Sequence, residues 1–238
     1  MADQFGRTKM LLGQQGMDRL KAARVAVFGI GGVGGYAAEA LARSGVGALD
    51  LIDHDRVSLT NLNRQLYALH STVGKLKTEA ARERIEDINP ACTVTCHPLF
   101  YTPETADQFD FTQYDYVIDA IDTVTGKIQL VTEAQKAGTP IICAMGAGNK
   151  LDASLFRVER LSNTTVCPLA RVMRRELRAR GLKDIEVVYS PEPAKRPLET
   201  EEQTDRRGLP GSVAWVPSVA GLLLAGHVVL KLCEGAEE

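Results

Sequence analysis

Five charged residues between positions 53 and 122 are of the types that act on phosphate groups. Two are cations, Arg64 and Lys77, and three are carboxylates, Asp53, Asp55 and Asp122. Cations offset the negative charge that develops in phosphate chemistry, and a carboxylate can hold magnesium. Hydride transfer needs a flat apolar pocket for a nicotinamide ring and no such charge density. The set therefore favours phosphate chemistry over an NAD(P)-dependent oxidoreductase.

A glycine-rich segment, Gly29-Ile-Gly31-Gly32-Val-Gly34, supplies a matching anion site. It lies between an apolar, β-branched run at 25–28 and an Ala- and Leu-rich run at 37–43, which predict a buried strand and a helix. Glycine lets the backbone approach a ligand, and free N–H groups at a helix start attract phosphate. Asp53 ends a second apolar run nineteen residues after Gly34, where an acid would hold a ribose hydroxyl. The segment predicts nucleotide binding and leaves the nucleotide open.

Strand and helix patterns alternate along most of the chain. Strands are predicted at 25–28, 49–52, 93–97, 116–119, 140–144, 156–161 and 185–189, and helices at 37–43, 74–88 and 125–137. This alternation predicts an α/β fold, a doubly wound, mostly parallel, Rossmann-like sheet with helices on both faces. Loops after such strands converge at one edge of the sheet, which would gather the five charged residues around one nucleotide.

Length and composition predict one domain over 1–238. The net charge of −2 gives no global attraction to nucleic acid or membrane. The apolar stretch 213–232 contains Pro217 and Lys231, so a buried final helix is predicted rather than a membrane span. A Pro- and charge-rich stretch at 191–210 predicts a mobile loop. The five cysteines, without any Cys-x-x-Cys pair, predict free thiols in a cytoplasmic protein.

A basic helix follows in the second half of the chain. Its arginines are spaced i, i+3, i+4 and i+7, which places Arg171, Arg174, Arg175 and Arg178 on one helical face. Two interpretations stay open at this point. The face is either an ordinary solvated surface or a local footprint for the phosphate backbone of tRNA.

Five motifs resemble the superfamily of ubiquitin-activating enzymes and molybdopterin and thiamine adenylyltransferases. They are Gly29-Ile-Gly-Gly-Val-Gly34, Asp53-His-Asp55, Asn61-Leu-Asn-Arg-Gln65, Val73-Gly-Lys-Leu-Lys77 and Ile118-Asp-Ala-Ile-Asp122. The resemblance covers roughly residues 5 to 160 and 212 to 232. It implies a ligase-like enzyme that activates a carboxylate as an acyl-adenylate, using ATP and Mg²⁺.

The same resemblance assigns roles to individual residues. Asp53 would bind the ribose, Asn61, Arg64 and Lys77 the phosphates, and Asp122 the magnesium. The full nucleotide-binding set is Gly29, Gly31, Gly32, Gly34, Asp53, Asp55, Asn61, Arg64, Gln65, Lys77 and Asp122, and the catalytic set is Arg7, Arg64, Lys77 and Asp122. Phe5-Gly-Arg7 resembles an arginine that reaches the nucleotide from a partner subunit, which implies a homodimer. By itself the sequence also permits an arm folded back within one chain.

Three segments point to one branch of the superfamily, the bacterial tRNA threonylcarbamoyladenosine dehydratases. They are Asp122-Thr-Val-Thr-Gly-Lys127, Ala144-Met-Gly-Ala-Gly-Asn-Lys-Leu-Asp152 and Val216-Pro-Ser-Val-Ala-Gly221. One departure is Cys167-Pro168, where an acid is expected before the proline, so Cys167 is a poor candidate for a catalytic role. Whether Na⁺ or K⁺ binds near 146–152 stays open.

The resulting hypothesis is ATP-dependent cyclisation of threonylcarbamoyladenosine next to the tRNA anticodon. The main alternative uses the same adenylation chemistry on the C-terminus of a small sulfur-carrier protein and would imply a sulfur-transfer partner. A nicotinamide oxidoreductase and a tRNA-binding module without catalysis are the remaining hypotheses. No membrane partner is expected.

Overall fold

The structure, a computed structural model, describes residues 3–198 and 210–234. Its centre is a sheet of seven strands in the order β3-β2-β1-β4-β5-β7-β6. In chain order these are β1 (Arg24–Phe28), β2 (Ala48–Ile52), β3 (Thr93–His97), β4 (Tyr116–Asp119), β5 (Ile141–Ala144), β6 (Arg157–Arg160) and β7 (Glu186–Tyr189). All neighbours pair in parallel except β6 and β7. The prediction of an α/β, mostly parallel sheet is confirmed.

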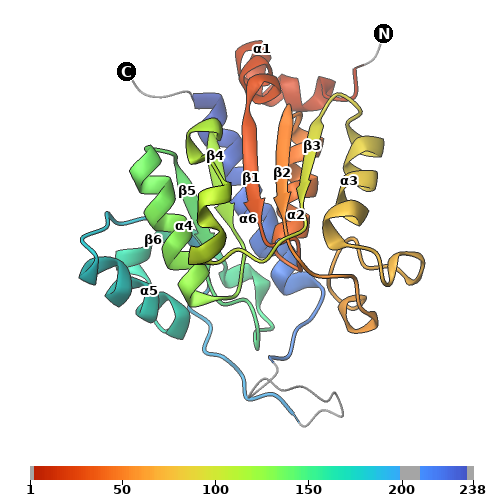
Figure 1. The fold of residues 1–238 in the computed structure, drawn as a ribbon. Coiled ribbons are helices and arrows are strands. Elements are labelled where there is room, and N and C mark those ends of the chain that lie inside the picture. The colour runs from red at the N-terminus through yellow and green to blue at the C-terminus, as the bar shows by residue number, and fades with distance from the viewer. Residues whose placement is uncertain (1–2, 199–209, 235–238) are drawn as a thin grey trace.

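Helices cover both faces of the sheet (Figure 1). They are α1 (Gly6–Ala22), α2 (Gly34–Ser44), α3 (Lys77–Ile88), α4 (Val124–Ala137), α5 (Pro168–Ala179) and α6 (Trp215–Glu234). Side chains alternate along β1, so Val25 and Val27 join the core that contains α2, α3 and α6. Ala26 and Phe28 join the opposite core with α4 and α5. The chain is therefore wound on both sides of one sheet.

Helix α6 is packed into the molecule against α2. A Cβ added at Gly221 would lie 2.2 Å from the Val33 carbonyl oxygen, so the two helix backbones touch at this glycine. Val216, Leu224 and Val228 are completely buried. By length and composition alone α6 could cross a membrane. Its buried side chains instead complete the core, which confirms the prediction of a buried final helix.

The predicted element boundaries hold to within a few residues. Helix α3 begins at Lys77 rather than at residue 74, because Gly74 has a φ of 89° and Leu76 is extended. Gly45 ends α2 in a left-handed conformation with a φ of 94°, as glycine commonly does at this position. Most of the loop predicted at 191–210 lies outside the described residues and stays a prediction.

Candidate functional site

A cavity of about 540 Å³ opens at the carboxyl ends of the central strands. This is the edge at which ligands bind to open parallel sheets. Its lining includes Gly29, Gly31, Gly32, Asp53, His54, Asp55, Ser58, Asn61, Arg64, Gln65, Lys77, Leu99, Phe100, Tyr101, Ala120, Ile121, Asp122, Ala147, Gly148, Pro210, Ser212 and Pro217. Both cations and all three carboxylates singled out in the sequence therefore face one space.

The glycine loop joins β1 to α2 at the floor of this cavity. Gly29 has a φ of 89°, and a Cβ there would lie 2.7 Å from the Ala120 carbonyl oxygen. A Cβ at Gly34 would lie 1.8 Å from the Gly29 carbonyl oxygen, so the turn closes only without side chains. The N-terminal end of α2 thus meets the cavity, where its unpaired N–H groups and the helix dipole favour an anion.

Asp53 connects the end of β2 to the glycine loop. Its Oδ2 accepts a hydrogen bond from the Ile30 N–H at 2.7 Å, and its Oδ1 accepts one from the Asp55 N–H at 2.8 Å. Each carboxylate oxygen has more than one lone pair, so these bonds leave acceptor capacity for a ribose hydroxyl. The position beside the glycine loop suits the predicted ribose contact.

Lys77 and Asp55 form an ion pair within the cavity. The Lys77 Nζ lies 2.6 Å from Asp55 Oδ2, and Lys77 is 6% exposed at the first residue of α3. The His54 Nε2 lies 3.2 Å from the other Asp55 oxygen. One ligand atom from each of Asp53, His54 and Asp55 lies within 4.8 Å of the others. The arrangement offers both a buried cation for phosphate and carboxylate oxygens for a metal ion.

The 58–65 turn places polar groups opposite the glycine loop. The Asn61 Oδ1 accepts the Ser58 N–H at 3.2 Å, which orients the amide and leaves its nitrogen to donate to a phosphate. Arg64 Nη1 donates to the Thr60 carbonyl at 2.8 Å. Its Cγ is 3.7 Å from the Cβ position of Gly32, and Gln65 Nε2 is 3.8 Å from that of Gly31. These side chains overlie the site where phosphates would bind.

The turn that carries Asp122 is supported by a buried ion pair. Asp119 ends β4 and is fully buried, and Lys127 on α4 is 1% exposed. The Lys127 Nζ lies 3.0 and 2.9 Å from the two Asp119 oxygens and donates to the Ala144 carbonyl at 2.7 Å. Asp119 Oδ1 also accepts the Ile121 N–H at 3.2 Å. Lys127, noticed in the sequence only as a branch feature, thus shapes the loop leading to Asp122.

Two walls of the cavity were absent from the predicted set. Leu99, Phe100 and Tyr101 follow the end of β3, so the rule that pointed to Asp53 and Asp122 could also have found them. Phe100 contacts His54 edge to face, with ring centroids 4.6 Å apart. Pro210 and Ser212 come from the distant segment before α6, a region from which no site residue was predicted.

The structure does not bring Arg7 to the cavity. Arg7 lies in α1, at the end of the sheet opposite to the cavity (Figure 1). Its neighbour Phe5 packs against Gly45, at the C-terminal end of α2, whereas the glycine loop lies at the N-terminal end. The eleven residues of α2 span about 16 Å. Arg7 could therefore reach a nucleotide only in a neighbouring subunit.

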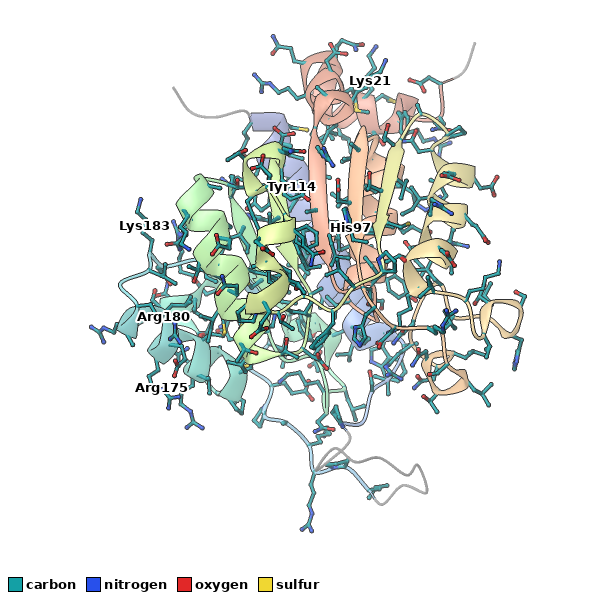
Figure 2. The ribbon with its side chains drawn as sticks, in the orientation of Figure 1. Lys21, His97, Tyr114, Arg175, Arg180 and Lys183 are labelled. Carbon is teal, nitrogen blue, oxygen red and sulfur yellow. The ribbon has the colours of Figure 1, made fainter. Side chains whose placement is uncertain are left out.

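The arginines of α5 surround a larger hollow of about 860 Å³, away from the glycine loop. Arg175 pairs with Glu176 at 2.7 Å, and Arg180 pairs with the same carboxylate. Arg174 turns inward and donates to the Thr164 carbonyl at 2.8 Å. Figure 2 shows Arg175, Arg180 and Lys183 at the outer edge of the molecule, around and just after α5. The predicted arginine face thus exists, but Arg174 is engaged in holding the adjacent turn.

The cysteines show no features of nucleophiles. All five are free. Burial raises the pKa of Cys92 to about 11 and raises that of Cys143 well above its ordinary value, so both thiols stay protonated at neutral pH. Cys167 is buried where α5 begins. None of these three lines the nucleotide cavity.

Comparisons with known proteins identify the family and several relatives of this chain. The model of the ThiF family matches residues 5–238. The chain is 45% identical to the tRNA threonylcarbamoyladenosine dehydratase of Bacillus subtilis, across 100% of this chain and 97% of that protein. Two crystal structures of Escherichia coli tRNA N6-threonylcarbamoyladenosine dehydratase are also similar. The AMP complex has 37% identity and a TM-score of 0.87, the ATP complex 36% and 0.88, and each covers 97% of this chain and 94% of the other.

Proposed function

This chain belongs to the ThiF family, and we propose that it is an ATP-dependent tRNA threonylcarbamoyladenosine dehydratase. One observation carries the proposal. A single cavity joins the glycine loop, Asp53, the cations Arg64 and Lys77, and Asp122. These groups suit the transfer of an adenylyl group to a carboxylate. The Bacillus subtilis relative named for this reaction matches along the whole chain.

The first step uses the charges of the cavity. An oxygen of the threonylcarbamoyl carboxylate attacks the α-phosphorus of ATP, and the bond from the α-phosphorus to the oxygen that bridges it to the β-phosphate breaks. Pyrophosphate leaves, carrying the electron pair of that bond. Arg64 and Lys77 offset the growing charge on the phosphates, and the N-terminal end of α2 assists them. Lys77 exchanges its pairing with Asp55 for the phosphate in this step.

The second step needs no nucleophile from the protein. A nucleophilic group within the same modification attacks the activated carbonyl carbon, loses its proton and closes a ring. The bond between that carbon and the phosphate-linked oxygen breaks, and AMP leaves with the oxygen. The net change in the nucleoside is loss of water. A chain whose buried thiols stay protonated is suited to this intramolecular route.

We also propose that Mg²⁺ accompanies ATP, with Asp122 as its protein ligand. Mg²⁺ prefers oxygen donors and commonly uses one or two carboxylates together with substrate phosphates. The cavity offers Asp122 and the clustered oxygens of Asp53 and Asp55, so the donor set fits. A bound Mg²⁺ would withdraw charge from the phosphates. A further Na⁺ or K⁺ in the 146–152 loop is disfavoured by Lys150, whose ammonium is already buried there.

For tRNA we propose the face of α5 as a phosphate-binding surface. Arg171 and Arg178 are exposed and have no ion pair in the part of the chain that the structure describes. Phosphate contacts of this kind give affinity without sequence specificity. A tRNA substrate implies a cytoplasmic location.

A homodimer completes the proposal. Met10 and Leu11 on α1 are 84% and 88% exposed, and Leu222 and Leu230 on α6 are about half exposed. Helices α1 and α6 also touch each other, since a Cβ at Gly16 would lie 3.2 Å from Cys233 Sγ. Exposed apolar side chains on two helices that touch each other are typical of a subunit interface. The same interface would allow Arg7 to enter the partner's cavity.

ATP–pyrophosphate exchange tests the function. Exchange should require tRNA that bears threonylcarbamoyladenosine, because only a bound carboxylate forms the acyl-adenylate. Unmodified tRNA is the matched control, and a small sulfur-carrier protein with a free C-terminus is the competing substrate. Exchange supported by the carrier and not by modified tRNA would replace the proposal with the carrier-activating alternative, which would also call for a sulfur-transfer partner.

A further inference from the structure

The loop after β5 fixes both ends of the connection between β7 and α6, and it does so largely through Asn149. The Asn149 N–H donates to the Gly211 carbonyl at 2.8 Å, and the Asn149 Oδ1 accepts the Gly211 N–H at 2.7 Å. The Asn149 carbonyl accepts the Lys195 N–H at 2.7 Å. Asn149 thus binds both the N–H and the carbonyl of Gly211, and it also holds Lys195 in the segment that follows β7.

Asn149 has an unusual backbone that suits this role. Its φ is 60°, in the left-handed region that non-glycine residues seldom adopt and that asparagine tolerates best. The neighbouring residues hold the loop in place. Leu151 and Asp152 donate their N–H groups to the Glu192 carboxylate at 3.0 and 3.1 Å, and Glu192 is 9% exposed. The hydrogen bonds of the surrounding residues therefore hold Asn149 in this backbone conformation.

The segment that Asn149 holds forms a wall of the nucleotide cavity. Pro210 and Ser212 flank Gly211, and both line the cavity. On the opposite side, Asn63 Nδ2 donates to the Ser212 carbonyl at 3.0 Å, which ties the wall to the turn that carries Arg64. A Cβ at Gly148 would lie 2.9 Å from the Pro210 Cβ, so the wall sits directly on the Asn149 loop.

We propose that Asn149 is a positioning residue for ATP, which acts by holding the Pro210–Ser212 wall (210–212) against the phosphate-binding turn. The proposal rests on the ATP site proposed above. Asn149 need not touch the nucleotide. Its side-chain oxygen fixes the backbone of Gly211, and the flanking residues Pro210 and Ser212 line the cavity.

The test compares Asn149→Gly with Asn149→Asp. Glycine adopts the same backbone but lacks the acceptor for the Gly211 N–H, whereas aspartate keeps an acceptor and tolerates the left-handed region. Asn163→Gly is the matched control, because Asn163 is an exposed asparagine outside the cavity. Calorimetric titration with Mg-ATP gives the Kd, pyrophosphate exchange gives KM and kcat, and hydrogen exchange reports protection of the Gly211 amide.

Asn149→Gly should raise the Kd and KM for ATP by about 2- to 10-fold, the range expected for one lost hydrogen bond, while kcat changes by less than about 2-fold. The Gly211 amide should lose protection in Asn149→Gly and keep it in Asn149→Asp and Asn163→Gly. An unchanged Kd for ATP in folded Asn149→Gly overturns the proposal. If Asn149→Gly fails to fold, the wild-type protein provides the test: rapid hydrogen exchange of its Gly211 amide would also overturn the proposal. Wild-type protein that binds no ATP would instead refute the proposed function.

Discussion

The carboxylates around the cavity have different tasks, which their surroundings assign. Asp53 receives two backbone N–H groups, so it is held rigidly and suits a positioning contact with a ribose. Asp55 is paired with Lys77. Asp122 is exposed on the turn after β4, and it lines the cavity. As an exposed carboxylate that lines the cavity, Asp122 is suited to the proposed contact with a solvated metal ion.

Asp122→Ala should abolish adenylation and leave the fold intact. The substitution removes the proposed Mg²⁺ ligand, whereas the exposed position makes a large loss of stability unexpected. Pyrophosphate exchange checks the loss of adenylation, and the thermal unfolding midpoint of the same preparation checks that the fold is intact. Asp53→Ala is the comparison and should mainly weaken ATP binding. Near-normal turnover in well-folded Asp122→Ala protein would remove Asp122 from the site.

Lys127→Met should destabilise the protein strongly, by about 3–5 kcal/mol, because it leaves the Asp119 carboxylate buried without its partner. Urea unfolding measures the difference in free energy. The double variant Asp119→Asn with Lys127→Met removes both charges and should recover a large part of the loss. If the double variant were as unstable as the sum of the single variants, the two side chains would not be acting as a pair.

At the scale of elements, Asp50 connects three strands. Arg24 of β1 forms two hydrogen bonds to it, at 2.7 and 2.9 Å, and His97 of β3 forms one at 2.9 Å. Burial raises the pKa of the Asp50 carboxyl, but the hydrogen bonds from His97 and Arg24 and the charge of Arg24 outweigh burial. The pKa therefore lies below its ordinary value. This linkage binds the strands that carry the glycine loop and Asp53.

Asp50→Asn should accordingly destabilise the protein at pH 7 and matter less in acid. A lowered pKa in the folded state contributes stability above the unfolded pKa of about 3.9, and this contribution is lost as pH falls through the folded value. A loss of about 1–3 kcal/mol is expected at pH 7. Urea unfolding of both proteins between pH 7 and pH 3 should show the difference shrinking below about pH 4. A difference that grows in acid would reverse the direction assigned to the pKa.

Helix α5 contains arginines with two different tasks. The double variant Arg171→Gln and Arg178→Gln should weaken tRNA binding and reduce the log–log salt slope by about 0.7–0.9 for each lost phosphate contact. ATP binding should stay unchanged. Arg174→Gln should instead lower stability, since the Arg174 guanidinium holds the Thr164 carbonyl. Filter binding across a salt series measures the slope, and an unchanged slope would identify α5 as an ordinary solvated helix.

Much of this architecture could be predicted because its signals are local. The spacing of apolar residues and the positions of the glycines predicted the strands, α2 and the glycine loop. Acids at strand ends indicated the edge of the sheet where Asp53 and Asp122 line one cavity. The Pro210–Ser212 wall (210–212) could not be predicted, because it depends on hydrogen bonds to Asn149 across 62 residues of chain. The inward orientation of Arg174 could not be predicted either. Helical spacing shows which face of α5 carries Arg174, but it does not show that the side chain bonds to the Thr164 carbonyl.

At the scale of the whole molecule, α1 lies at one end of the sheet (Figure 1), and the cavity is lined by residues that follow the carboxyl ends of the strands at the other end. Every other residue of the predicted catalytic set lines the cavity, and Arg7 alone does not. The exposed Met10 and Leu11 lie close to Arg7 on α1, so the surface that would bury them also carries the arginine. Pairing of two subunits would then complete the active site.

Mixing two inactive variants tests this arrangement. Arg7→Ala and Asp122→Ala homodimers should each be nearly inactive, because every site lacks either the arginine or the proposed Mg²⁺ ligand. In a heterodimer, one site keeps Asp122 and receives Arg7 from the partner, so subunit exchange should restore up to about half of the wild-type activity for each dimer. Differently tagged subunits and tandem purification would verify the heterodimer, and self-mixed Arg7→Ala protein is the control. Purified heterodimers that stay inactive would show that Arg7 does not act across the interface.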